Sequence, residues 1–511
     1  MSSFPKNEPF GMKSICFSDT ISVSNFFMSS QKLTKIIATI GPSSESEEMI
    51  KKLIHEGVNC FRFNTKHNEI IWHEQTIEKV KRISREMGVG IATLLDLQGP
   101  SVRLVLPSSD SIIVANGDEL ELVTDLKNII KKGFSTTYPE IIKFFKDDTR
   151  ILVDDGELEF FVKRNKSGQV LLKATRSGEI KPNKSVNIPD GDFPLPLLTP
   201  RDEKMLEIIK KGNVDWVGIS FVRCADDLVQ VRKKLKSIGI NPDSVKLMAK
   251  IETAQALTAL SEIIAVSDAV MVARGDLGVE ASLEQVPYYQ KKMINYARNM
   301  GKPVVTATQM LQSMIFSPTP TRAEVSDVAN AIYDKTDAVM LSAESASGKY
   351  PLQAVKSLTK IALYNEKLRL ANETKVQIEH EDNEVMVGSA AIAMYEHLST
   401  TSQEFGGFVV FTRSGRTARL VAAHRPQVPI FTFASTLQVA EMLSIVFGIL
   451  AFEDDVLNCE IGERVTSDDV KRSLEFLVKK NFIKKGQTLV VLHGDIWNEK
   501  GGTNTVKIVE V

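Results

Sequence analysis

Cysteine is scarce in this sequence, with only 4 among 511 residues, and no two of them form a CxxC pair. Structural zinc sites usually draw on such pairs, and disulfide frameworks are typical of small, cysteine-dense secreted domains. Neither is indicated here, and this usage is typical of a reducing compartment, so we expect a cytoplasmic protein. The four residues are Cys16, Cys60, Cys224 and Cys459.

Long hydrophobic runs and an excess of charge of either sign are also missing. No stretch approaches the roughly 18 uncharged apolar residues of a membrane-spanning helix, so we expect no membrane partner. The 63 basic and 64 acidic side chains leave a net charge of -1, which argues against nucleic acid as a partner but allows a local basic pocket. Because 43% of the residues are hydrophobic, the chain can bury a full core, which excludes a disordered protein.

The first 30 residues contain no arginine and show no clear periodicity. Glu8, Lys13 and Asp19 interrupt the apolar core that a secretory signal needs, and organellar transit peptides are rich in arginine and poor in acids. We interpret residues 1–32 as an N-terminal extension, or as a segment before an alternative start at Met28. Organellar targeting by residues 1–30 is the alternative interpretation.

Short apolar β-type runs alternate with amphipathic helical runs from Thr34 onward. This rhythm contains eight strands and is interrupted once, after the third strand. Eight βα units close naturally into a (β/α)8 barrel with an active site at the carboxyl ends of the strands. A doubly wound open sheet is the alternative, but the sequence has no GxGxxG opening. We expect the strands at residues 35–40, 60–64, 90–97, 215–220, 246–251, 269–273, 303–308 and 338–342.

The predicted fold class is therefore α/β, with three structural parts after the extension. Residues 33–100 and 199–370 form the TIM barrel, and residues 101–198, rich in short strands and turns, form an inserted β domain. The charged stretch 379–384 is interpreted as a linker, and residues 371–511 form a C-terminal α/β domain.

Capping residues predict several helix boundaries. We expect a helix at residues 46–56 with Ser44 as a possible N-cap, and a long helix at 69–87 that ends at Gly88. In the C-terminal domain we expect one continuous helix at residues 438–447.

Polar side chains gather where the predicted barrel strands end. Any one group has a structural interpretation, such as an ion pair between Arg62 and Asp96. Five groups on the same rim of a barrel favour an active site instead. The strand ends carry Arg62, Asn64, Lys66 and His67; Asp96 and Arg103; Lys250 and Glu252; Arg274, Gly275 and Asp276; and Thr306, Thr308 and Gln309.

The residue types at these ends favour phosphoryl transfer. Glu252 and Asp276 are hard oxygen ligands suited to a Mg²⁺ ion that keeps waters and bridges substrate oxygens. Arg62, Arg103 and Lys250 supply positive charge for a phosphoryl group. A metal-dependent aldolase would use similar carboxylates but would not need three cations.

Several sequence strings resemble those of the pyruvate kinase family. The resemblance covers nearly all of residues 33–511 and implies a barrel enzyme that transfers phosphate from phosphoenolpyruvate to ADP, giving pyruvate and ATP. It also implies Mg²⁺ (or Mn²⁺), usually K⁺, and a homotetramer. The strings are TKIIATIGPSS (34–44), FRFN (61–64), ILVDDGELE (151–159), AKIET (249–253), MVARGDLGVE (271–280), TATQML (306–311), PTRAEVSDVANAI (320–332), LSAESASGKYP (341–351) and a bacterial-type GGTNT ending (501–505).

The resemblance further implies roles for individual residues. Lys250 matches the lysine that stabilises charge on the transferring phosphoryl group, and residues 101–198 resemble a mobile lid that excludes water. Arg201 stands where the family usually has lysine, which keeps the charge but changes its geometry. The other matches are Arg62 and Thr308 as catalytic residues; Glu252 and Asp276 as Mg²⁺ ligands; Arg62, Gly275, Asp276 and Thr308 as phosphoenolpyruvate contacts; and Asn64, His67, Arg103 and Arg201 as nucleotide contacts.

One departure from the family pattern concerns K⁺. Asn64 and Asp96 remain from the family's K⁺ site, but Lys66 and Leu97 replace two hydroxyl ligands. Family members that work without K⁺ carry leucine at the position of Leu97 and a lysine four residues later, where this chain has Ser101. We hypothesise that the Lys66 ammonium replaces the monovalent cation, so that K⁺ is dispensable. The alternative is that Lys66 faces solvent and K⁺ binding is merely weakened.

The C-terminal domain contains a turn that resembles the family's allosteric sugar-phosphate site. Gly415 permits a tight turn between a strand and a helix, where backbone N–H groups can hold a phosphate. A simple helix cap is the alternative. We expect a phosphorylated effector bound by Ser414, Gly415, Arg416 and Thr417, with Trp497 and Lys500 nearby.

The sequence leaves two functions from different classes. An active pyruvate kinase is favoured because all the expected catalytic residues are present. A catalytically silent sensor that binds phosphoenolpyruvate or a sugar phosphate is the alternative, motivated by the altered K⁺ site.

Overall fold

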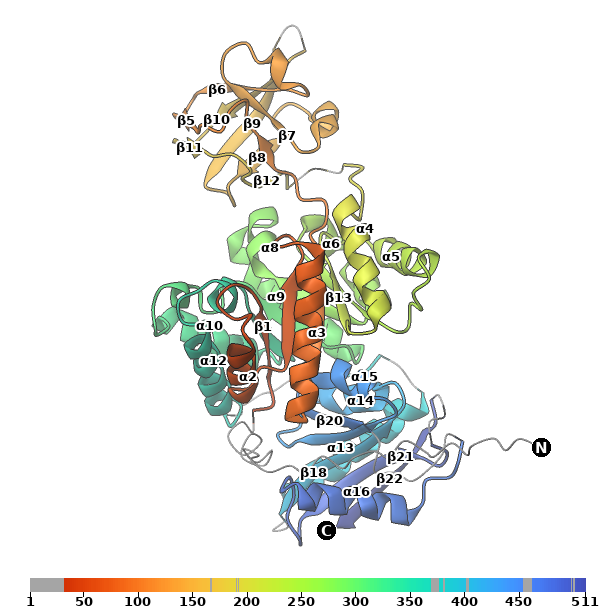
Figure 1. Ribbon diagram of the computed structural model, residues 1–511. Helices are drawn as coiled ribbons and strands as arrows, with labels where there is room; N and C mark the ends of the chain where they lie inside the picture. The colour runs from red at the N-terminus through yellow and green to blue at the C-terminus, as the bar shows by residue number, and fades with distance from the viewer. Residues whose placement is uncertain are drawn as a thin grey trace, which may run out of the picture.

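The computed structural model describes residues 32–165, 168–189, 191, 193–368, 376–379, 382–400, 404–453, 462–497, 499 and 501–511. Within them, a closed barrel lies between an inserted β domain and a C-terminal α/β domain (Figure 1). The expected N-terminal extension lies outside the described residues except for Lys32. Among the described residues, none of the helices combines the length and the apolar character that crossing a membrane requires.

The barrel closes with eight parallel strands in the order β1-β17-β16-β15-β14-β13-β3-β2, which confirms the predicted fold. The insertion follows β3, as the loss of helical periodicity predicted. The strands are β1 (Lys35–Thr39), β2 (Cys60–Asn64), β3 (Ala92–Asp96), β13 (Trp216–Ile219), β14 (Lys246–Ile251), β15 (Ala269–Ala273), β16 (Val304–Ala307) and β17 (Ala338–Leu341).

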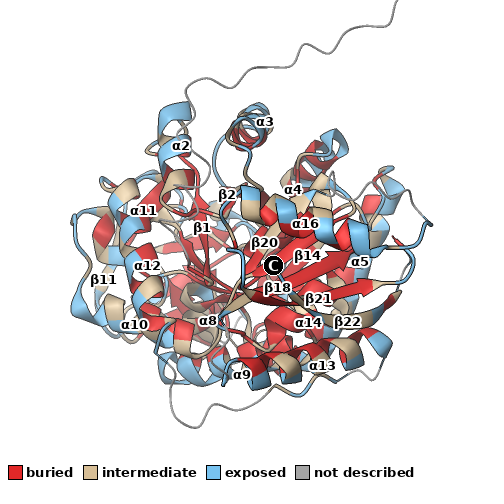
Figure 2. Ribbon diagram, turned by 90° about the horizontal axis from the view of Figure 1, so that it is seen from below, coloured by how far each residue is buried: buried red, intermediate tan, exposed pale blue. Residues whose placement is uncertain are grey.

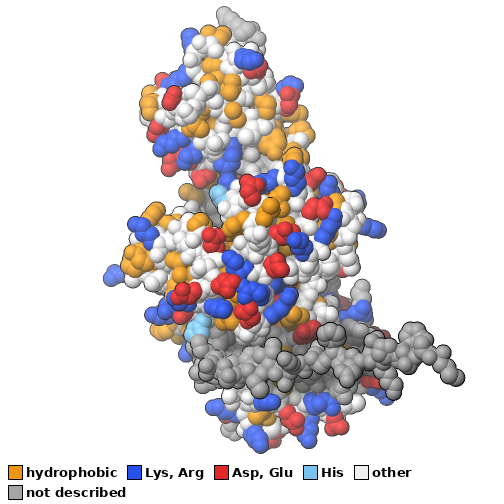
Figure 3. All heavy atoms as spheres, viewed as in Figure 1, with side chains coloured by type: hydrophobic (Ala, Val, Ile, Leu, Met, Phe, Trp, Pro, Cys, Tyr) orange, Lys and Arg blue, Asp and Glu red, His pale blue; other side chains and the backbone are white. Residues whose placement is uncertain are grey.

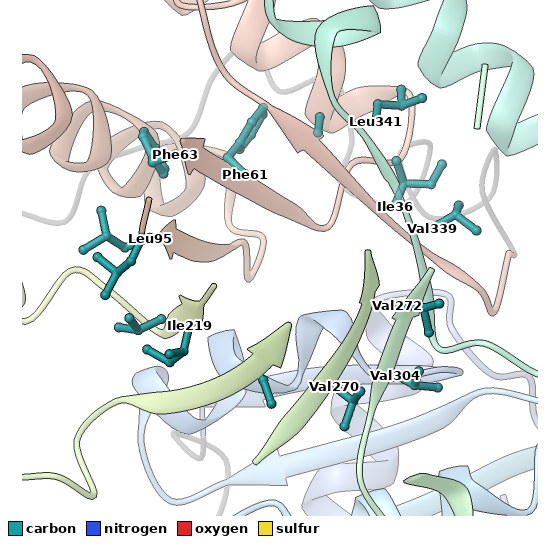
Figure 4. Close-up of a cluster of buried hydrophobic side chains, with 14 of the residues drawn as sticks. Ile36, Phe61, Phe63, Leu95, Ile219, Val270, Val272, Val304, Val339 and Leu341 are labelled. Atoms are coloured by element: carbon teal, nitrogen blue, oxygen red, sulfur yellow. The ribbon is translucent and has the colours of Figure 1, made fainter. Parts of the chain in front are cut away.

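Helices cover the outside of the barrel, and the alternating side chains of the strands pack against them. Phe61 and Phe63 of β2 belong to the outer hydrophobic cluster together with Ile219 of β13 (Figure 4). The helices are α2 (Glu47–His55), α3 (Ile70–Met87), α4 (Pro200–Leu206), α5 (Ala225–Ser237), α6 (Ala254–Thr258), α7 (Leu260–Val266), α8 (Arg274–Glu280), α9 (Val286–Asn299), α10 (Arg322–Tyr333), α11 (Ala343–Ala346) and α12 (Pro351–Asn365), with 3-10 turns η3 (Glu207–Lys211), η4 (Leu283–Gln285) and η5 (Gln312–Ile315).

Capping explains where two of these helices begin or end. Helix α3 ends at Gly88, which adopts a left-handed φ of 65°, as predicted. The expected N-cap of α2 was wrong: Ser46, not Ser44, accepts a hydrogen bond from the N–H of Met49 at 3.2 Å. Ser44 instead accepts from the N–H of Gly41 at 3.1 Å, so its hydroxyl stabilises the preceding loop.

The inserted domain has its own hydrophobic core and contains strands and 3-10 turns. Its larger sheet has the order β12-β8-β9-β10-β6-β7-β4, and β11 pairs with β5 in a second sheet. The elements are β4 (Leu104–Val105), β5 (Ile112–Val114), β6 (Glu119–Leu122), η1 (Leu126–Asn128), β7 (Gly133–Thr136), η2 (Pro139–Phe144), β8 (Arg150–Val153), β9 (Leu158–Arg164), β10 (Val170–Ala174), β11 (Gly178–Ile180) and β12 (Val186–Asn187).

The C-terminal domain is a five-stranded sheet in the order β20-β19-β18-β21-β22, in which only the β21–β22 pair is antiparallel. Its central strands are largely buried (Figure 2). The expected helix at 438–447 is shorter, because α15 gives way to a 3-10 turn, and β20 was not predicted. The elements are α13 (Asn383–Leu398), β18 (Phe405–Thr412), α14 (Arg416–Ala423), β19 (Ile430–Ala434), α15 (Leu437–Met442), η6 (Leu443–Ile445), β20 (Ile449–Glu453), α16 (Ser467–Lys479), β21 (Thr488–Gly494) and β22 (Thr503–Glu510).

The C-terminal domain packs on the end of the barrel where the strands begin. Trp216, the first residue of β13, donates its indole N–H to the carbonyl of Met442 at 3.1 Å. The ammonium of Lys35, at the start of β1, donates to the carbonyl of Ile449 at 2.7 Å. The opposite end of the barrel therefore remains for the strand-end residues, and it faces the inserted domain (Figure 1).

Candidate active site

A cavity of about 330 Å³ lies between the carboxyl ends of the barrel strands and the inserted domain. The barrel contributes polar side chains from several strand ends, as the sequence predicted. The insert contributes Asp155, Ser185 and Asn187. The predicted site residues that line it are Arg62, Asn64, Lys66, Asp96, Arg103, Lys250, Glu252 and Asp276.

Basic and acidic groups alternate at the base of this cavity. Arg62 Nε lies 2.6 Å from Asp96 Oδ2, and Lys250 Nζ lies 3.2 Å from Asp96 Oδ1 and 2.8 Å from Glu252 Oε1. Lys250 also donates to Ser220 Oγ at 2.6 Å. The two cations are thus held in fixed positions by groups that are themselves buried.

The pKa values of these groups follow from burial and from their partners. Burial alone would lower the pKa of Lys250, but Asp96 and Glu252 outweigh it and raise that pKa above its ordinary value. Burial raises the pKa of Glu252, although the Lys250 ammonium opposes this effect. For Asp96, burial is outweighed by Lys250 and Arg62, so its pKa is lowered. Lys250 therefore stays cationic throughout the physiological pH range.

Thr308 and the start of α8 form the neighbouring part of the rim. The N–H of Gly275 donates to Thr308 Oγ1 at 2.8 Å, and Arg274 donates to the Thr308 carbonyl at 2.8 Å. Thr308 and Gln309 adopt positive φ angles of 66° and 55°, which non-glycine residues rarely do. Backbone strain of this kind concentrates at functional sites, so it supports a binding role for this turn.

Glu252 and Asp276 are the carboxylates that could hold a divalent metal. Both line the cavity, and Glu252 Oε2 also accepts a hydrogen bond from the N–H of Phe221 at 2.8 Å. Within the described residues, no group of three or more His, Cys, Asp and Glu side chains could hold a metal ion. Two hard oxygen donors facing one cavity fit an ion that completes its shell with water and substrate oxygens, as Mg²⁺ commonly does.

Lys66 lines the cavity, but it does not reach the acidic residue of the expected K⁺ site. Within the described residues, no ion pair shorter than 4.0 Å joins Lys66 to Asp96. Although the residue is exposed overall, burial lowers the pKa of its ammonium, and Arg103 lowers it further. Asp276 and Asp155 act in the opposite direction. The pKa of the Lys66 ammonium therefore depends on Asp276, one of the two candidate metal ligands, and on Asp155 of the insert.

The residues that line the cavity do not include His67 and Arg201. Arg201 Nε donates to the Thr65 carbonyl at 2.7 Å, and its Nη2 donates to the carbonyls of His67 and Asn68. Nε2 of His73 lies 2.8 Å from the carbonyl oxygen of His67. These bonds hold the loop that carries Asn64 and Lys66, while direct nucleotide contacts by His67 and Arg201 stay predictions.

The structure brings into the site further residues for which the sequence predicted no role. Ser220, the partner of Lys250, follows β13 and could have been found by the same strand-end argument as the others. Asn187 of the insert donates to Glu280 of α8 at 2.9 Å and joins the insert to the barrel. No pattern in the sequence connects these two residues, because 93 positions separate them.

The predicted phosphate-binding turn of the C-terminal domain lies beside a second cavity, of about 410 Å³. Ser414, Thr417 and Trp497 line it, whereas Gly415 and Arg416 are absent from its lining. Gly415 has the expected left-handed φ of 79°. Arg416 forms ion pairs with Asp382 and Glu384, and its phosphate contact stays a prediction. Lys500 lies outside the described residues.

Comparisons with known proteins agree with this architecture. Residues 31–355 match the family model described as pyruvate kinase, barrel domain, and residues 390–509 match pyruvate kinase, alpha/beta domain. A pyruvate kinase of Methylorubrum extorquens is 36% identical over 484 residues, covering 95% of this chain and 98% of the relative. Pyruvate kinases of Clostridium perfringens and Staphylococcus saprophyticus are also 36% identical, covering 94% and 93% of this chain and 99% and 80% of the relatives.

Proposed function

The chain belongs to the pyruvate kinase family, and we propose that it transfers the phosphoryl group of phosphoenolpyruvate to ADP at the cavity between barrel and insert. The arrangement of Arg62, Asp96, Lys250 and Glu252 carries this proposal, because it places two fixed cations beside a carboxylate suited to a metal. The relatives favour an active kinase over a silent sensor.

Arg62 and Lys250 bind and orient the phosphoryl group in this proposal. In the reaction, the bond between phosphorus and the enol oxygen breaks and a bond to a β-phosphate oxygen of ADP forms. The enolate that leaves takes a proton from water at its methylene carbon and becomes pyruvate. Negative charge on the transferring group is stabilised by the two cations, whose positions are already fixed by Asp96. Gly275 and Thr308 orient the substrate carboxylate from the adjacent turn.

Glu252 and Asp276 would hold the divalent metal, Mg²⁺ or Mn²⁺. When bound, such an ion polarises phosphoryl oxygens and neutralises developing charge. The protein contributes the anionic pair that attracts the ion. The hydrogen bond from the N–H of Phe221 also fixes the orientation of the Glu252 carboxylate.

The inserted domain excludes water from the reaction and completes the nucleotide side. Asn64 and Arg103 line the cavity from the barrel rim and the insert, respectively, and are proposed to contact ADP. Arg103 donates to the Asn183 carbonyl at 2.6 Å, so its guanidinium is positioned before the nucleotide arrives. His67 and Arg201 are proposed to support this side through their loop.

The test is the formation of ATP and pyruvate from phosphoenolpyruvate and ADP with and without Mg²⁺. We expect turnover that requires the divalent ion and that falls strongly in Lys250→Met. Tight binding of phosphoenolpyruvate without turnover would instead support the sensor.

We further propose that the Lys66 ammonium makes K⁺ dispensable. Opposite unit charges attract by about 4 kcal/mol at about 4 Å and an effective dielectric constant of about 20, and this attraction falls only in proportion to distance, so an ammonium elsewhere in the cavity reduces the need for a second cation. The ammonium would act on the charge of the cavity as a whole, since it forms no ion pair with Asp96 within the described residues.

The double variant Lys66→Ser with Leu97→Thr tests this proposal because it restores two hydroxyl ligands. We expect activity without K⁺ in the original chain and K⁺-dependent activity in the double variant. An unchanged response to K⁺ would refute the role of Lys66.

Membership of the family also supports proposals about the assembly, the location and the partners of the chain. We propose a homotetramer in the cytoplasm, regulated by a phosphorylated effector and without nucleic-acid partners. Acidic and basic side chains are interspersed over the face seen in Figure 3, which supports the last point. Light scattering of the purified full-length protein should give four times the mass of one chain.

A further inference from the structure

Two buried hydroxyl groups contact the cations that are proposed to bind the phosphoryl group. Thr39 is the last residue of β1, Ser220 directly follows β13, and both residues are at most 4% exposed. Ser220 Oγ accepts a hydrogen bond from Lys250 Nζ at 2.6 Å, and Thr39 Oγ1 accepts one from Arg62 Nη1 at 3.0 Å. Each cation therefore has a neutral acceptor in addition to its carboxylate partner.

Each of these hydroxyl groups donates its own proton to the backbone of a neighbouring strand. Ser220 Oγ donates to the carbonyl of Leu97, just after β3, at 2.8 Å. Thr39 Oγ1 donates to the carbonyl of Leu341, at the end of β17, also at 2.8 Å. A hydroxyl group has one proton and two lone pairs, so a hydroxyl that donates to a carbonyl acts only as an acceptor toward its second partner. Both hydroxyls are thus oriented as acceptors for the two cations.

The carboxylates alone do not fix the direction of the Lys250 ammonium. Its Nζ lies 3.2 Å from Asp96 Oδ1, but this buried oxygen has no hydrogen-bond partner among the described residues. Glu252, at 2.8 Å, is also proposed to hold the metal, and Asp96 is shared with Arg62. Ser220 is a neutral acceptor, so it orients an N–H group of the lysine without cancelling the positive charge that the phosphoryl group needs.

The guanidinium of Arg62 is held in a similar way. Asp96 accepts from its Nε at 2.6 Å and Thr39 accepts from its Nη1. Within the described residues, its Nη2 donates to no protein group, and the side chain lines the catalytic cavity. Because a guanidinium is planar, two fixed nitrogens determine where the third one points. The remaining donor is therefore available to a phosphoryl oxygen.

We propose that Ser220 and Thr39 are positioning residues for phosphoryl transfer, which hold the Lys250 ammonium and the Arg62 guanidinium in the orientation that the phosphoryl group requires. The inference rests on the proposed transfer from phosphoenolpyruvate to ADP and adds two residues that act through the cations. The competing explanation is structural: each hydroxyl would only prolong the hydrogen bonding between two neighbouring barrel strands. Loss of the hydroxyl would then lower stability and leave the reaction unchanged.

The experiment measures steady-state kinetics and the calorimetric binding of phosphoenolpyruvate with Mg²⁺, using the full-length protein. Ser220→Ala and Thr39→Val should each lower kcat at least about tenfold, because a hydrogen bond to a charged group is lost. The dissociation constant of phosphoenolpyruvate should rise by at least about threefold, because the same cations bind the phosphoryl group before transfer. Thr39→Ser keeps the hydroxyl and should stay within about threefold of the original kcat.

Two control variants remove buried hydroxyls that contact no cation. Ser267 donates to the carbonyl of Ile264 at 3.0 Å, and Thr359 donates to the carbonyl of Glu56 at 2.7 Å. Ser267→Ala and Thr359→Val therefore match the two test variants in chemistry. Both should leave kcat and the dissociation constant within about twofold, since neither hydroxyl positions a charged group.

A double-mutant cycle separates positioning from a structural effect. Ser220→Ala in a Lys250→Met background should lower kcat by less than about twofold, because the group that Ser220 positions is already missing. An effect through the fold of the barrel would instead lower kcat by the same factor in both backgrounds. Such equal factors would overturn the proposal, and so would test variants that behave like the two controls.

Failure of folding and failure of the catalytic proposal can both be recognised. Thermal unfolding checks each variant, and the comparison of Thr39→Val with Thr39→Ser decides the question if Ser220→Ala does not fold. If the original chain binds phosphoenolpyruvate without turnover, the catalytic proposal fails while the dissociation constants still test the positioning of the cations. Absence of both binding and turnover would overturn both proposals.

Discussion

The two cavities of this molecule differ in whether their cations have carboxylate partners. In the catalytic cavity, Arg62 and Lys250 have carboxylate partners at 2.6 and 2.8 Å before any substrate arrives. In the second cavity, beside the turn after β18, Lys246 lines the wall and has no such partner within the described residues. Paired cations are held in position for chemistry, whereas an unpaired, partly buried cation gains most from a ligand that brings its own charge.

The largest effect is expected where a paired cation is removed from the catalytic cavity. Lys250→Met should lower kcat by about 10³-fold, because a positioned electrostatic donor to the transition state is lost. A coupled assay of pyruvate formation measures this, with Lys233→Met as the control of equal chemistry on the exposed side of α5. A loss of less than tenfold would show that Lys250 does not stabilise the transferring group.

A second test compares a buried lysine, Lys81, with a partly buried lysine, Lys246, at the interface between the barrel and the C-terminal domain. Lys81 lies 2.6 Å from Asp215 and 2.7 Å from Glu441, whereas Lys246 is unpaired within the described residues. Lys81→Met should lower the free energy of unfolding by about 3 kcal/mol, because it leaves two buried carboxylates without a counter-charge. Lys246→Met should not lower it. Urea unfolding of both variants measures these free energies. Equal losses of stability would contradict the distinction between a paired and an unpaired lysine.

The pH dependence of stability should differ in sign for these two lysines. Burial lowers the pKa of Lys81, but Asp215 and Glu441 outweigh it and raise that pKa above 10.5. Its contribution is therefore present below pH 10.5 and is lost as the pH rises through the folded value. Burial lowers the pKa of Lys246 below 10.5, so the folded chain gains stability as the pH rises toward that value. The measurement is the free energy of unfolding against pH for Lys81→Met, Lys246→Met and the original chain. Each variant should lack the pH dependence contributed by the lysine that it has lost.

A smaller effect separates two carboxylates of the catalytic cavity. Glu252→Gln should raise the Mg²⁺ concentration at half-maximal activity by at least about tenfold, because a charged ligand is lost. Glu280→Gln removes a carboxylate that instead accepts from Asn187 of the insert at 2.9 Å. It should leave that Mg²⁺ concentration within about twofold. Equal shifts would mean that Glu252 is not the metal ligand.

The barrel and its rim could be predicted because each strand carries its own information. Strand β14, for example, is a mostly apolar run of six residues in which Lys250 stands one position before the end. The strand pattern and the polar residue at its carboxyl end can therefore be recognised within the same six residues. Parallel strands in a closed barrel then bring all such ends to one rim without any further knowledge of contacts.

The parts that could not be predicted depend on contacts between distant segments. The second cavity is lined by both Lys246 and Ser414, which are 168 positions apart in the chain. The pairing of Arg416 with Asp382 depends on how α13 packs beside α14. Strand β20 was missed because four of its five residues are not fully buried, which leaves no clear alternation to detect.

The most direct test of the central claim is ATP and pyruvate formation from phosphoenolpyruvate and ADP with Mg²⁺, in a buffer free of K⁺ and again with K⁺ added. We expect full turnover in both buffers, with K⁺ dispensable because of Lys66. Activity only with K⁺ would keep the kinase and contradict the role of Lys66. Absence of turnover in both buffers, with phosphoenolpyruvate still bound, would contradict the catalytic account itself.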